Sequence, residues 1–550
     1  MKIGDIRMIL GDIKKIDLSA SSFERMITQG NLYVDKTRFI ENFLNTSSSV
    51  QLIARHRRLG KSLNMDMLRC FLTDKTDYRC LFKGLYIETS PIWKMANSSP
   101  TFYFDFKGLK LETYREQIIK QVDRHIYSII DPASLSGYLK RQYEQIINDL
   151  SRAEDSLYFL TELTFEVTGK RSYILIDEYD KLLLDNYSSD KYDEIRAFET
   201  SMLSSALKGN HYLEKGLLTG VMRVSHESMF SGLNNVKTFD VFNDQIYTDD
   251  YGLTDREITE LNQLTDFAIE ELKSWYNGVK INGHAIYNTY SVMSYLDSNT
   301  YDCFWGKSGT LDMISNLLND KRKLTLTRLL NGEQTEVSID DRISLKQFSS
   351  HFDDKAFYSL LVQGGYLTLD KYVANKDFAL VSIPNHELLA VWKNFIFGKI
   401  YHSAVHVRTL FDNENNLAQL ANDMEYFLSD RLSYHDLATY EGESKTKTYE
   451  RIYHVFLLGI LSAYDDVRCR YPLSNRESGD GRFDILIERT NAYYIFECKA
   501  CDKKSDLVKE VNNALSQIDT KRYGADLKKD KRLIKIGVAF FGKLCKVKCR

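Results

Sequence analysis

The segment Val50-Gln-Leu-Ile-Ala-Arg55-His-Arg-Arg-Leu-Gly60-Lys61-Ser62-Leu decides how the first half of the chain is interpreted. Its first five residues form the short apolar run that is typical of a buried strand. Gly-Lys-Ser then opens a stretch with helical periodicity, so the segment predicts a strand, a tight loop and a helix. A phosphate-binding loop requires this order, because backbone N–H groups and the helix N-terminus bind phosphate oxygens.

The residues that begin the predicted helix have distinct expected roles at a bound nucleotide. Lys61 is expected to bind the β- and γ-phosphates and Ser62 to bind Mg²⁺, while Gly60 completes the loop. The motif G-x-x-x-x-G-K-[ST] is incomplete, because Arg55 stands where its first glycine is expected. A Gly-Lys-Ser sequence alone is a weak indication, since it also arises by chance at helix starts.

A second apolar run, Tyr173–Ile176, ends in the carboxylates Asp177 and Glu178. In P-loop ATPases an aspartate at a strand end holds Mg²⁺, and the glutamate that follows polarises the attacking water. The alternative is a strand followed by a capped helix, because Asp177 and Asp180 both suit a helix N-terminus. Both halves of the motif lie at strand ends and in the expected order, so together they favour an ATP site.

A third strand-like run is followed by Thr219-Gly-Val-Met-Arg223. Thr219 is a candidate to contact the γ-phosphate or its water, and Arg223 is a candidate to neutralise charge in the transition state. A strand end with a surface arginine accounts for the same residues equally well.

The C-terminal segment from Gly481 to Lys499 predicts a β-hairpin that turns at Thr490-Asn491. In that register Asp484 lies opposite Glu497, roughly 5 Å apart at Cβ, and Lys499 shares their face. Opposed carboxylates repel each other unless a cation lies between them. The pair therefore predicts an Mg²⁺ or Mn²⁺ site at which Lys499 positions the attacking water for phosphodiester hydrolysis.

The same hairpin is also compatible with an ordinary surface ion pair between Lys499 and either acid. A zinc site at Cys498 and Cys501 is a further alternative. Zinc is disfavoured, because Cys498 falls on the face of the hairpin that is expected to be core. The residues expected on that core face are Phe483, Ile485, Ile487, Phe496 and Cys498.

Composition limits the class of protein. The chain has 550 residues, 43% hydrophobic and 27% charged, as in folded globular proteins of several domains. A formal net charge of −3 excludes a surface that binds polyanions everywhere. Residues 521–550 nevertheless hold eleven Lys or Arg against two Asp, which is either a solvated face or a DNA-binding surface.

Several further expectations concern location and assembly. The charged N-terminus does not resemble a signal peptide, and no apolar run is long enough to span a membrane. Eight scattered cysteines favour a reducing, cytoplasmic compartment. An oligomer is possible, and the sequence does not decide its size.

The pattern of elements predicts three regions with soft boundaries. Residues 1–250 read as an α/β domain with a mainly parallel sheet, 251–440 as a mostly helical middle region, and 441–550 as a second α/β domain. The expected strands are 50–54, 101–106, 173–176, 216–221, 483–488, 492–499 and 533–541. The expected helices include 254–264, 266–276, 417–428, 446–461 and 503–519.

These motifs resemble the AAA-ATPase-like family of bacterial proteins fused to a C-terminal nuclease-like domain of the PD-(D/E)XK superfamily. In that family's phosphate loop Arg also replaces the first glycine. His56 stands where the family usually has Pro, and Leu59 where it usually has Phe. Further matching segments are Tyr33–Thr37, Asp177–Lys181, Phe230–Asn235, Trp275–Gly278, Ser359–Leu361, Gly365–Thr368, Ile383–Asn385, Tyr453-His454 and Ser474–Arg482.

The resemblance implies an AAA-like N-terminal fold, a restriction-endonuclease-like C-terminal fold and ATP as a ligand. It implies DNA as a partner and DNA cleavage only by superfamily analogy. It also implies Glu450 as a further acid of the metal site and Gln517 as a residue that positions the site.

Three functions are compatible with these expectations. The first is an ATP-regulated nuclease, and the second is an ATP-dependent switch that grips nucleic acid without cutting it. The third is a scaffold that has kept both folds and lost both activities.

Overall fold

The computed structural model describes residues 9–222, 235–305, 317–330, 332–341, 353–373, 377–400, 416–431 and most of 453–550. Its contacts form two compact units. The N-terminal unit comprises Met1–Trp305 and Glu336–Glu387, and the C-terminal unit comprises Gly306–Thr335 and Leu388–Arg550. The boundaries at 250 and 440 remain a prediction. No helix among the described residues is long and apolar enough to cross a membrane.

The N-terminal unit is built on a five-stranded parallel sheet of order β4-β5-β6-β3-β7. Strand β3, which leads into the phosphate loop, pairs with both β6 and β7. The strand order therefore reverses beside β3, and ligands of open α/β sheets bind at such a point. The strands are β3 (Val50–Ala54), β4 (Thr101–Asp105), β5 (Ser172–Asp177), β6 (Leu213–Gly220) and β7 (Val236–Phe239).

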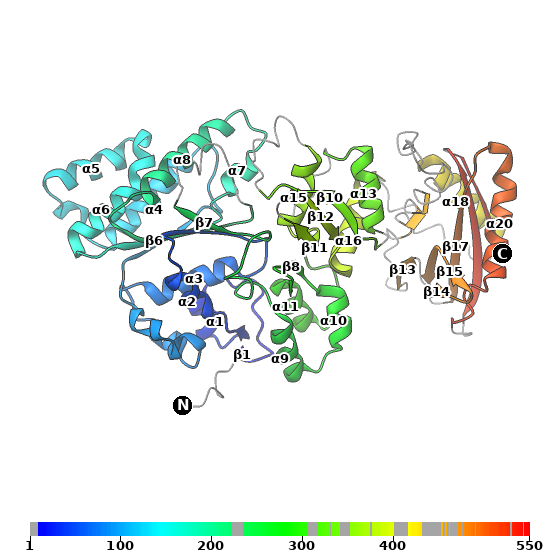
Figure 1. The fold of residues 1–550 in the computed structure, drawn as a ribbon, viewed down its shortest axis with the longest axis horizontal. Helices are drawn as coiled ribbons and strands as arrows, with labels where there is room; N and C mark the ends of the chain where they lie inside the picture. Colours follow the sequence, from blue (N-terminus) through cyan, green and yellow to red (C-terminus); the bar gives the residue numbers. More distant parts are fainter. Residues whose placement is uncertain are drawn as a thin grey trace. The chain divides into compact units, whose positions relative to one another are not determined.

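Helices cover both faces of this sheet (Figure 1). Helix α3 packs on one face, and α6 and α8 pack on the other. Every residue of β3 and β5 is buried, as expected of central parallel strands. The helices are α1 (Phe23–Thr28), α2 (Arg38–Asn45), α3 (Lys61–Leu72), α4 (Tyr114–Tyr127), α5 (Gly137–Asn148), α6 (Ser156–Thr168), α7 (Lys181–Asp185) and α8 (Tyr192–Leu207).

The rest of the N-terminal unit combines helices with small sheets. The expected helices at 254–264 and 266–276 correspond to α9 and α10, and a capping box of Thr254 and Glu257 begins α9. A three-stranded sheet of order β10-β12-β11 was not expected from the sequence. The elements are α9 (Asp255–Thr265), α10 (Ile269–Tyr276), β8 (Val279–Ile281), β9 (His284–Ile286), α11 (Thr289–Ser298), β10 (Thr335–Ser338), α15 (Asp354–Gln363), β11 (Thr368–Val373) and β12 (Phe378–Ser382).

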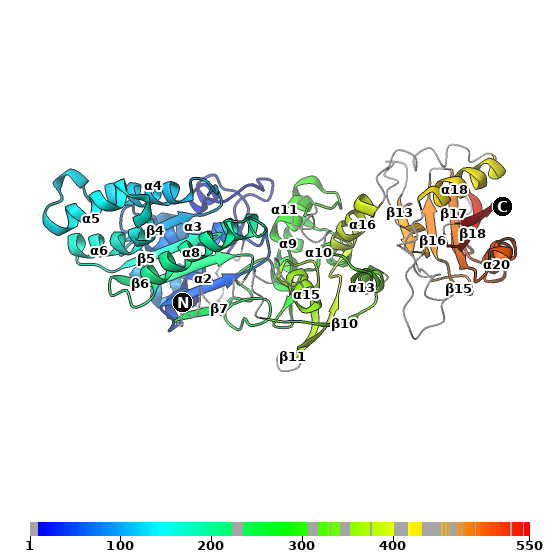
Figure 2. The ribbon, with the colours of Figure 1, turned by 90° about the horizontal axis from the view of Figure 1, so that it is seen from above.

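The C-terminal unit contains a mixed sheet of order β13-β16-β17-β18-β19. Strands β17 and β18 are parallel, and helix α20 connects them. Helix α18 packs on one face of the sheet and α20 on the other (Figure 2). The elements are α13 (Asp320–Leu330), α16 (His386–Ile400), α18 (Leu417–Arg431), β13 (Arg470–Ser474), β14 (Glu477–Ser478), β15 (Gly481–Arg482), β16 (Ile485–Glu488), β17 (Ala492–Ala500), α20 (Leu507–Thr520), β18 (Arg532–Phe541) and β19 (Leu544–Cys549).

The expected hairpin register is present over residues 485–488 and 493–496. The ladder ends at Ile485 and Phe496, so it does not include the predicted pair of Asp484 and Glu497. Ile485 pairs with Phe496, Glu488 pairs with Tyr493, and Arg489 donates its N–H to Ala492 O (2.8 Å) to close the turn. One expected core residue is on the other side of the sheet. Phe483 packs with Leu515 on α20, whereas Ile485, Ile487, Phe496 and Cys498 pack with α18. The chain bends at residue 484, so the alternation of β16 does not extend back to Phe483.

Most of the expected helix at 446–461 lies outside the described residues. The cysteines of the described chain are free, and Cys498 is buried in the core against α18. Within the described residues, no group of three or more His, Cys, Asp or Glu is arranged to hold a metal ion.

Candidate functional site

The phosphate loop runs from Arg55 to Gly60 between β3 and α3. Gly60 is the N-cap of α3 and has a left-handed φ of +85°, a conformation that glycine adopts without strain. The Lys61 ammonium donates to the backbone oxygens of Arg55 and His56, both at 2.9 Å. Burial lowers the pKa of Lys61 to about 8, although the carboxylates around Asp177 oppose that shift. The ammonium therefore lies inside the loop.

Two of the expected site residues, Ser62 and Thr219, contact the carboxylate of a third, Asp177. Ser62 Oγ, in the first turn of α3, donates to Asp177 Oδ2 (2.5 Å), and Thr219 Oγ1, at the end of β6, donates to Asp177 Oδ1 (2.5 Å). Asp177 ends β5 and is only 2% exposed. A carboxylate and two hydroxyls form a hard oxygen donor set, which fits Mg²⁺.

Glu178 has an unusual backbone conformation next to this cluster. Its φ is +51°, in the left-handed region that non-glycine residues seldom adopt. Its N–H donates to Asp177 Oδ1 (3.0 Å). Burial is the main cause that raises the pKa of Glu178, and the charge of Asp177 adds to it. Strain of this kind is frequent at functional sites, and a raised pKa suits a carboxyl that exchanges protons.

Asp180 and Tyr179 fix the end of β6, a role that the sequence did not indicate. Asp180 Oδ2 accepts the N–H groups of Val221 (2.9 Å) and Met222 (2.8 Å). The Tyr179 hydroxyl donates to Met222 O (2.9 Å), and the Tyr179 N–H donates to Thr219 O (3.0 Å). The Asp180 side chain makes no cap hydrogen bond to α7, so helix capping does not account for it.

Arg55 anchors the loop instead of contacting its interior. Its guanidinium is fully buried, forms an ion pair with Asp244, and donates to Phe239 O (3.4 Å) at the end of β7. The side chain that replaces the first glycine of the motif therefore fastens the loop to the neighbouring strand. Arg223 and residues 230–234 of another expected motif lie outside the described residues.

A cavity of about 190 Å³ adjoins the start of α3. Its walls are mostly apolar and include Leu59, Gly60 and Leu63 from the loop and helix, together with Tyr290 and Met293 from α11. Lys36 and Asp250 are among its few charged residues. A largely apolar pocket with few polar groups is typical of small-molecule sites.

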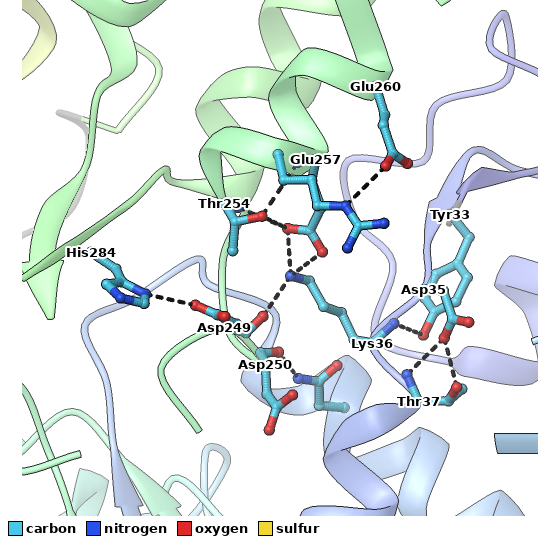
Figure 3. Close-up of polar contacts among 12 residues, drawn as sticks. Tyr33, Asp35, Lys36, Thr37, Asp249, Asp250, Thr254, Glu257, Glu260 and His284 are labelled. Carbon is cyan, nitrogen blue, oxygen red and sulfur yellow. Dashed lines mark hydrogen bonds and ion pairs between the residues drawn. The ribbon is translucent and has the colours of Figure 1, made fainter. Parts of the chain in front are cut away.

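Lys36, from the expected motif Tyr33–Thr37, belongs to a buried network (Figure 3). Its ammonium donates to both carboxylate oxygens of Glu257 (2.7 Å each) and to Asp249 O (2.8 Å). Glu257 also accepts the N–H of Thr254 in the capping box. Lys36 thereby joins the segment before α2 to the start of α9, and its three donors are directed at protein oxygens.

The expected nuclease-like residues gather between β17 and α20. Asp484 precedes β16, and its Oδ2 accepts the N–H of Cys498 (2.7 Å). Glu497 is 2% exposed; its Oε1 lies 3.3 Å from Lys499 Nζ and accepts a hydrogen bond from Gln517 on α20. The ion pair of Lys499 with an acid, which was the alternative to a metal site, is therefore present. Gln517 contacts the site as the resemblance implied.

Tyr523, which no sequence pattern had indicated, lies at the same place. Gln517 Nε2 donates to its hydroxyl (3.3 Å). Burial is the main cause that raises the pKa of Tyr523; the charges of Glu497 and Asp484 add to it and Lys499 opposes it. All three expected residues therefore act electrostatically on one hydroxyl. A glutamine followed six residues later by a tyrosine is the one signal that the sequence offers.

Elements around this site hold its backbone. His454 donates from Nε2 to Asp484 O (3.0 Å). The β14–β15 hairpin lies beside Tyr523, since Asp480 N donates to Lys521 O (2.8 Å) and Gly524 N to Ser478 Oγ (2.8 Å). This hairpin lies within Ser474–Arg482, one of the segments that match the family. Among the described residues the site holds two of the expected acids, and Glu450 lies outside them.

Five described cations of the basic run at residues 521–550 form ion pairs with acids. Lys535 contacts Asp519 (2.6 Å) and Lys531 contacts Glu488 (2.7 Å). The remaining ion pairs of the run include Arg522–Asp480, Lys546–Glu425 and Arg550–Asp519. These pairs offset part of the local positive charge.

Comparisons with known proteins match two segments of the chain. Residues 17–230 match a family model described as predicted AAA-ATPase, and residues 448–549 match a model of the PD-(D/E)XK nuclease superfamily. An uncharacterized protein in the vnfD 5′ region of Azotobacter chroococcum mcd 1 is 24% identical over 530 residues, which cover 93% of each chain. The chain thus joins an AAA-ATPase-like domain at its N-terminal end to a PD-(D/E)XK nuclease superfamily domain at its C-terminal end.

Proposed function

We propose that the N-terminal unit is an ATPase and that its nucleotide cycle regulates a metal-dependent DNA nuclease in the C-terminal domain. The convergence of Ser62, Asp177 and Thr219 beside the Lys61 ammonium carries this proposal. These side chains come from α3, β5 and β6, and they meet at the edge of the sheet where nucleotides bind in open α/β folds.

Each residue of this cluster has a defined task in the proposed ATPase. Lys61 leaves the loop carbonyls and binds the β- and γ-phosphates, while the α3 N-terminus binds phosphate oxygens. Mg²⁺, when bound by Ser62 and Asp177, neutralises charge on the phosphates. Glu178 accepts a proton from the attacking water, and Thr219 orients that water.

The cavity beside Gly60 and Leu63 is the proposed site of the base and ribose. It adjoins the start of the helix that would bind the phosphates, and its apolar walls suit an aromatic ring. Tyr290 and Met293 belong to α11, so a bound nucleotide would contact both the sheet domain and the helical region of this unit.

In the C-terminal domain, Asp484 and Glu497 are the proposed metal ligands, with Glu450 as the candidate third acid, and Lys499 is proposed to position the nucleophilic water. Gln517 bonds to Glu497 and to Tyr523 and thereby holds the carboxylate in place. A divalent metal would supply Lewis-acid stabilisation of the phosphate in the transition state.

A second candidate function is an ATP-dependent switch that binds nucleic acid without cutting it. One observation favours it: Glu497 is already paired with Lys499.

A nuclease assay separates the two functions. Radiolabelled single- and double-stranded DNA would be incubated with Mg²⁺ or Mn²⁺, with and without ATP, using the parent and Asp484→Asn. Metal-dependent cleavage that the substitution abolishes supports the nuclease, whereas DNA binding without cleavage supports the switch.

A further inference from the structure

Residues 252–304 of the same unit hold the tip of the phosphate loop. Each of the three residues at the tip has its own contact with this segment. Asn288 Nδ2 donates to Arg57 O (3.3 Å), and Gly252 N donates to Leu59 O (3.0 Å). The Arg58 guanidinium donates to Phe304 O (2.8 Å) and lies 3.9 Å from the centre of the Tyr290 ring. A movement of the loop backbone would therefore displace its contacts in residues 252–304.

The chain leaves the N-terminal unit at two places that lie close together. Trp305 and Glu387 are the last residues before segments of the C-terminal unit. Although 82 positions separate them, Trp305 N donates to Glu387 Oε1 (2.7 Å), which also accepts from Ser291 Oγ (3.0 Å). Both residues are buried. This hydrogen bond fastens the two exits to each other and to α11.

His56 touches both the Lys61 ammonium and these exits. Its backbone oxygen accepts from Lys61 (2.9 Å), and its ring packs edge-on against Trp305 with 6.1 Å between ring centres. Gly365 approaches the His56 ring so closely that a Cβ there would lie 2.8 Å from His56 Cγ. The ring is tightly packed, so a displacement of the His56 backbone must move its neighbours.

We infer that His56 is a positioning residue that couples the Lys61 ammonium to the Trp305–Glu387 hydrogen bond. The inference rests on the proposed nucleotide site. When phosphates attract the ammonium, the His56 carbonyl loses its donor and the backbone of residue 56 shifts. The packed ring carries that shift to Trp305 and weakens its hydrogen bond to Glu387. Nucleotide binding thereby loosens the exits that lead to the C-terminal unit.

Hydrogen exchange of the full-length protein tests this coupling. The amide of Trp305 would be followed by mass spectrometry without nucleotide and with saturating Mg²⁺ and a non-hydrolysable ATP analogue. In the parent protein, exchange of Trp305 should accelerate several-fold while the amides of residues 59–62 become protected. In His56→Ala, which keeps the carbonyl and removes the ring, residues 59–62 should still be protected and exchange of Trp305 should no longer respond.

Two further variants separate coupling from general destabilisation. His56→Phe restores a ring of similar size and should restore the response of Trp305, whereas His211→Ala, at an exposed position, should behave as the parent. The inference is overturned if the analogue protects residues 59–62 of the parent without changing Trp305, or if the response persists in His56→Ala. A parent in which neither segment responds and no nucleotide binds overturns the proposed nucleotide site, and the coupling with it.

Discussion

The hydroxyl of Ser62 donates to the carboxylate of Asp177 across 2.5 Å, although 115 positions separate the two residues. This contact brings the start of α3 to the end of β5. It also leaves a hydroxyl and a carboxylate side by side, as a magnesium ion bound to ATP would require.

Removing the Lys61 ammonium should weaken nucleotide binding by roughly 30-fold or more. Lys61→Ala removes the cation inside the loop, and loss of a charged hydrogen-bond partner costs about 2 kcal/mol or more, which is roughly a 30-fold loss of affinity. Isothermal titration with Mg²⁺–ATP measures the change. Lys208→Ala, at the exposed end of α8, is the matched control. An affinity equal to that of the parent would refute the phosphate-loop assignment.

Glu178→Gln should separate binding from hydrolysis. The amide keeps the size of the side chain and loses the charge that accepts a proton, so ATP affinity should stay within about threefold while turnover falls by roughly 100-fold or more. Phosphate release under saturating ATP provides the measurement. Asp180 is the other carboxylate that could serve as this base, but it is buried and its Oδ2 already accepts the N–H groups of Val221 and Met222. Unchanged turnover would therefore point to a base outside this motif.

The stability of the N-terminal unit should depend on pH through Asp180. Burial raises the pKa of Asp180 from 3.8 to about 6 in the folded protein. Between pH 3.8 and about 6 the folded state therefore binds more protons than the unfolded state. Protonated Asp180 contributes its full share to the free energy of unfolding below about pH 4, and this contribution is lost as the pH rises through 6.

Asp180→Asn cannot ionise, and its amide oxygen can still accept a backbone N–H. Relative to the parent, its free energy of unfolding should rise by roughly 2 to 3 kcal/mol between pH 4 and pH 7. Urea unfolding at several pH values measures the difference. Asp185→Asn, at an exposed position on α7, should show no such trend. If the free energy of unfolding of Asp180→Asn changed with pH in the same way as that of the parent, the raised pKa of Asp180 would be contradicted.

Divalent metal should stabilise the C-terminal domain through Asp484. Binding of Mg²⁺ or Mn²⁺ to the folded state raises its melting temperature by mass action. In Asp484→Asn the shift and any DNA cleavage should both disappear. The amide can still accept the Cys498 N–H, so the fold itself should persist. Asp480→Asn, in an exposed ion pair, is the control; a metal-induced shift that survives in Asp484→Asn would argue against this site.

Local patterns in the sequence were sufficient to predict the strand ends and the hairpin. Buried parallel strands such as β3 and β5 are short apolar runs, and the polar residues that end them are conspicuous. The register that places Ile485 opposite Phe496 follows from the position of one turn. Both predictions depend on interactions between residues close in sequence, where spacing determines geometry.

Interactions between distant segments could not be predicted in this way. Nothing near Arg55 indicates Asp244, its buried partner 189 positions away. The edge strand β7 is short and partly exposed, so it lacks the apolar signal of its neighbours. The basic run at 521–550 suggested a phosphate-binding surface because the acids that neutralise it, such as Glu425 and Asp519, come from other elements.

The buried pair of Arg55 and Asp244 has a consequence for any attempt to restore the standard motif in this phosphate loop. Restoring the consensus glycine at position 55 would improve the match to the motif and leave the buried Asp244 without its arginine, a loss that typically costs about 3–5 kcal/mol. A glycine at position 55 would therefore need a matching change at Asp244. Asp244, 189 positions away in the sequence, is in this sense as much a part of the phosphate loop as the residues around Lys61.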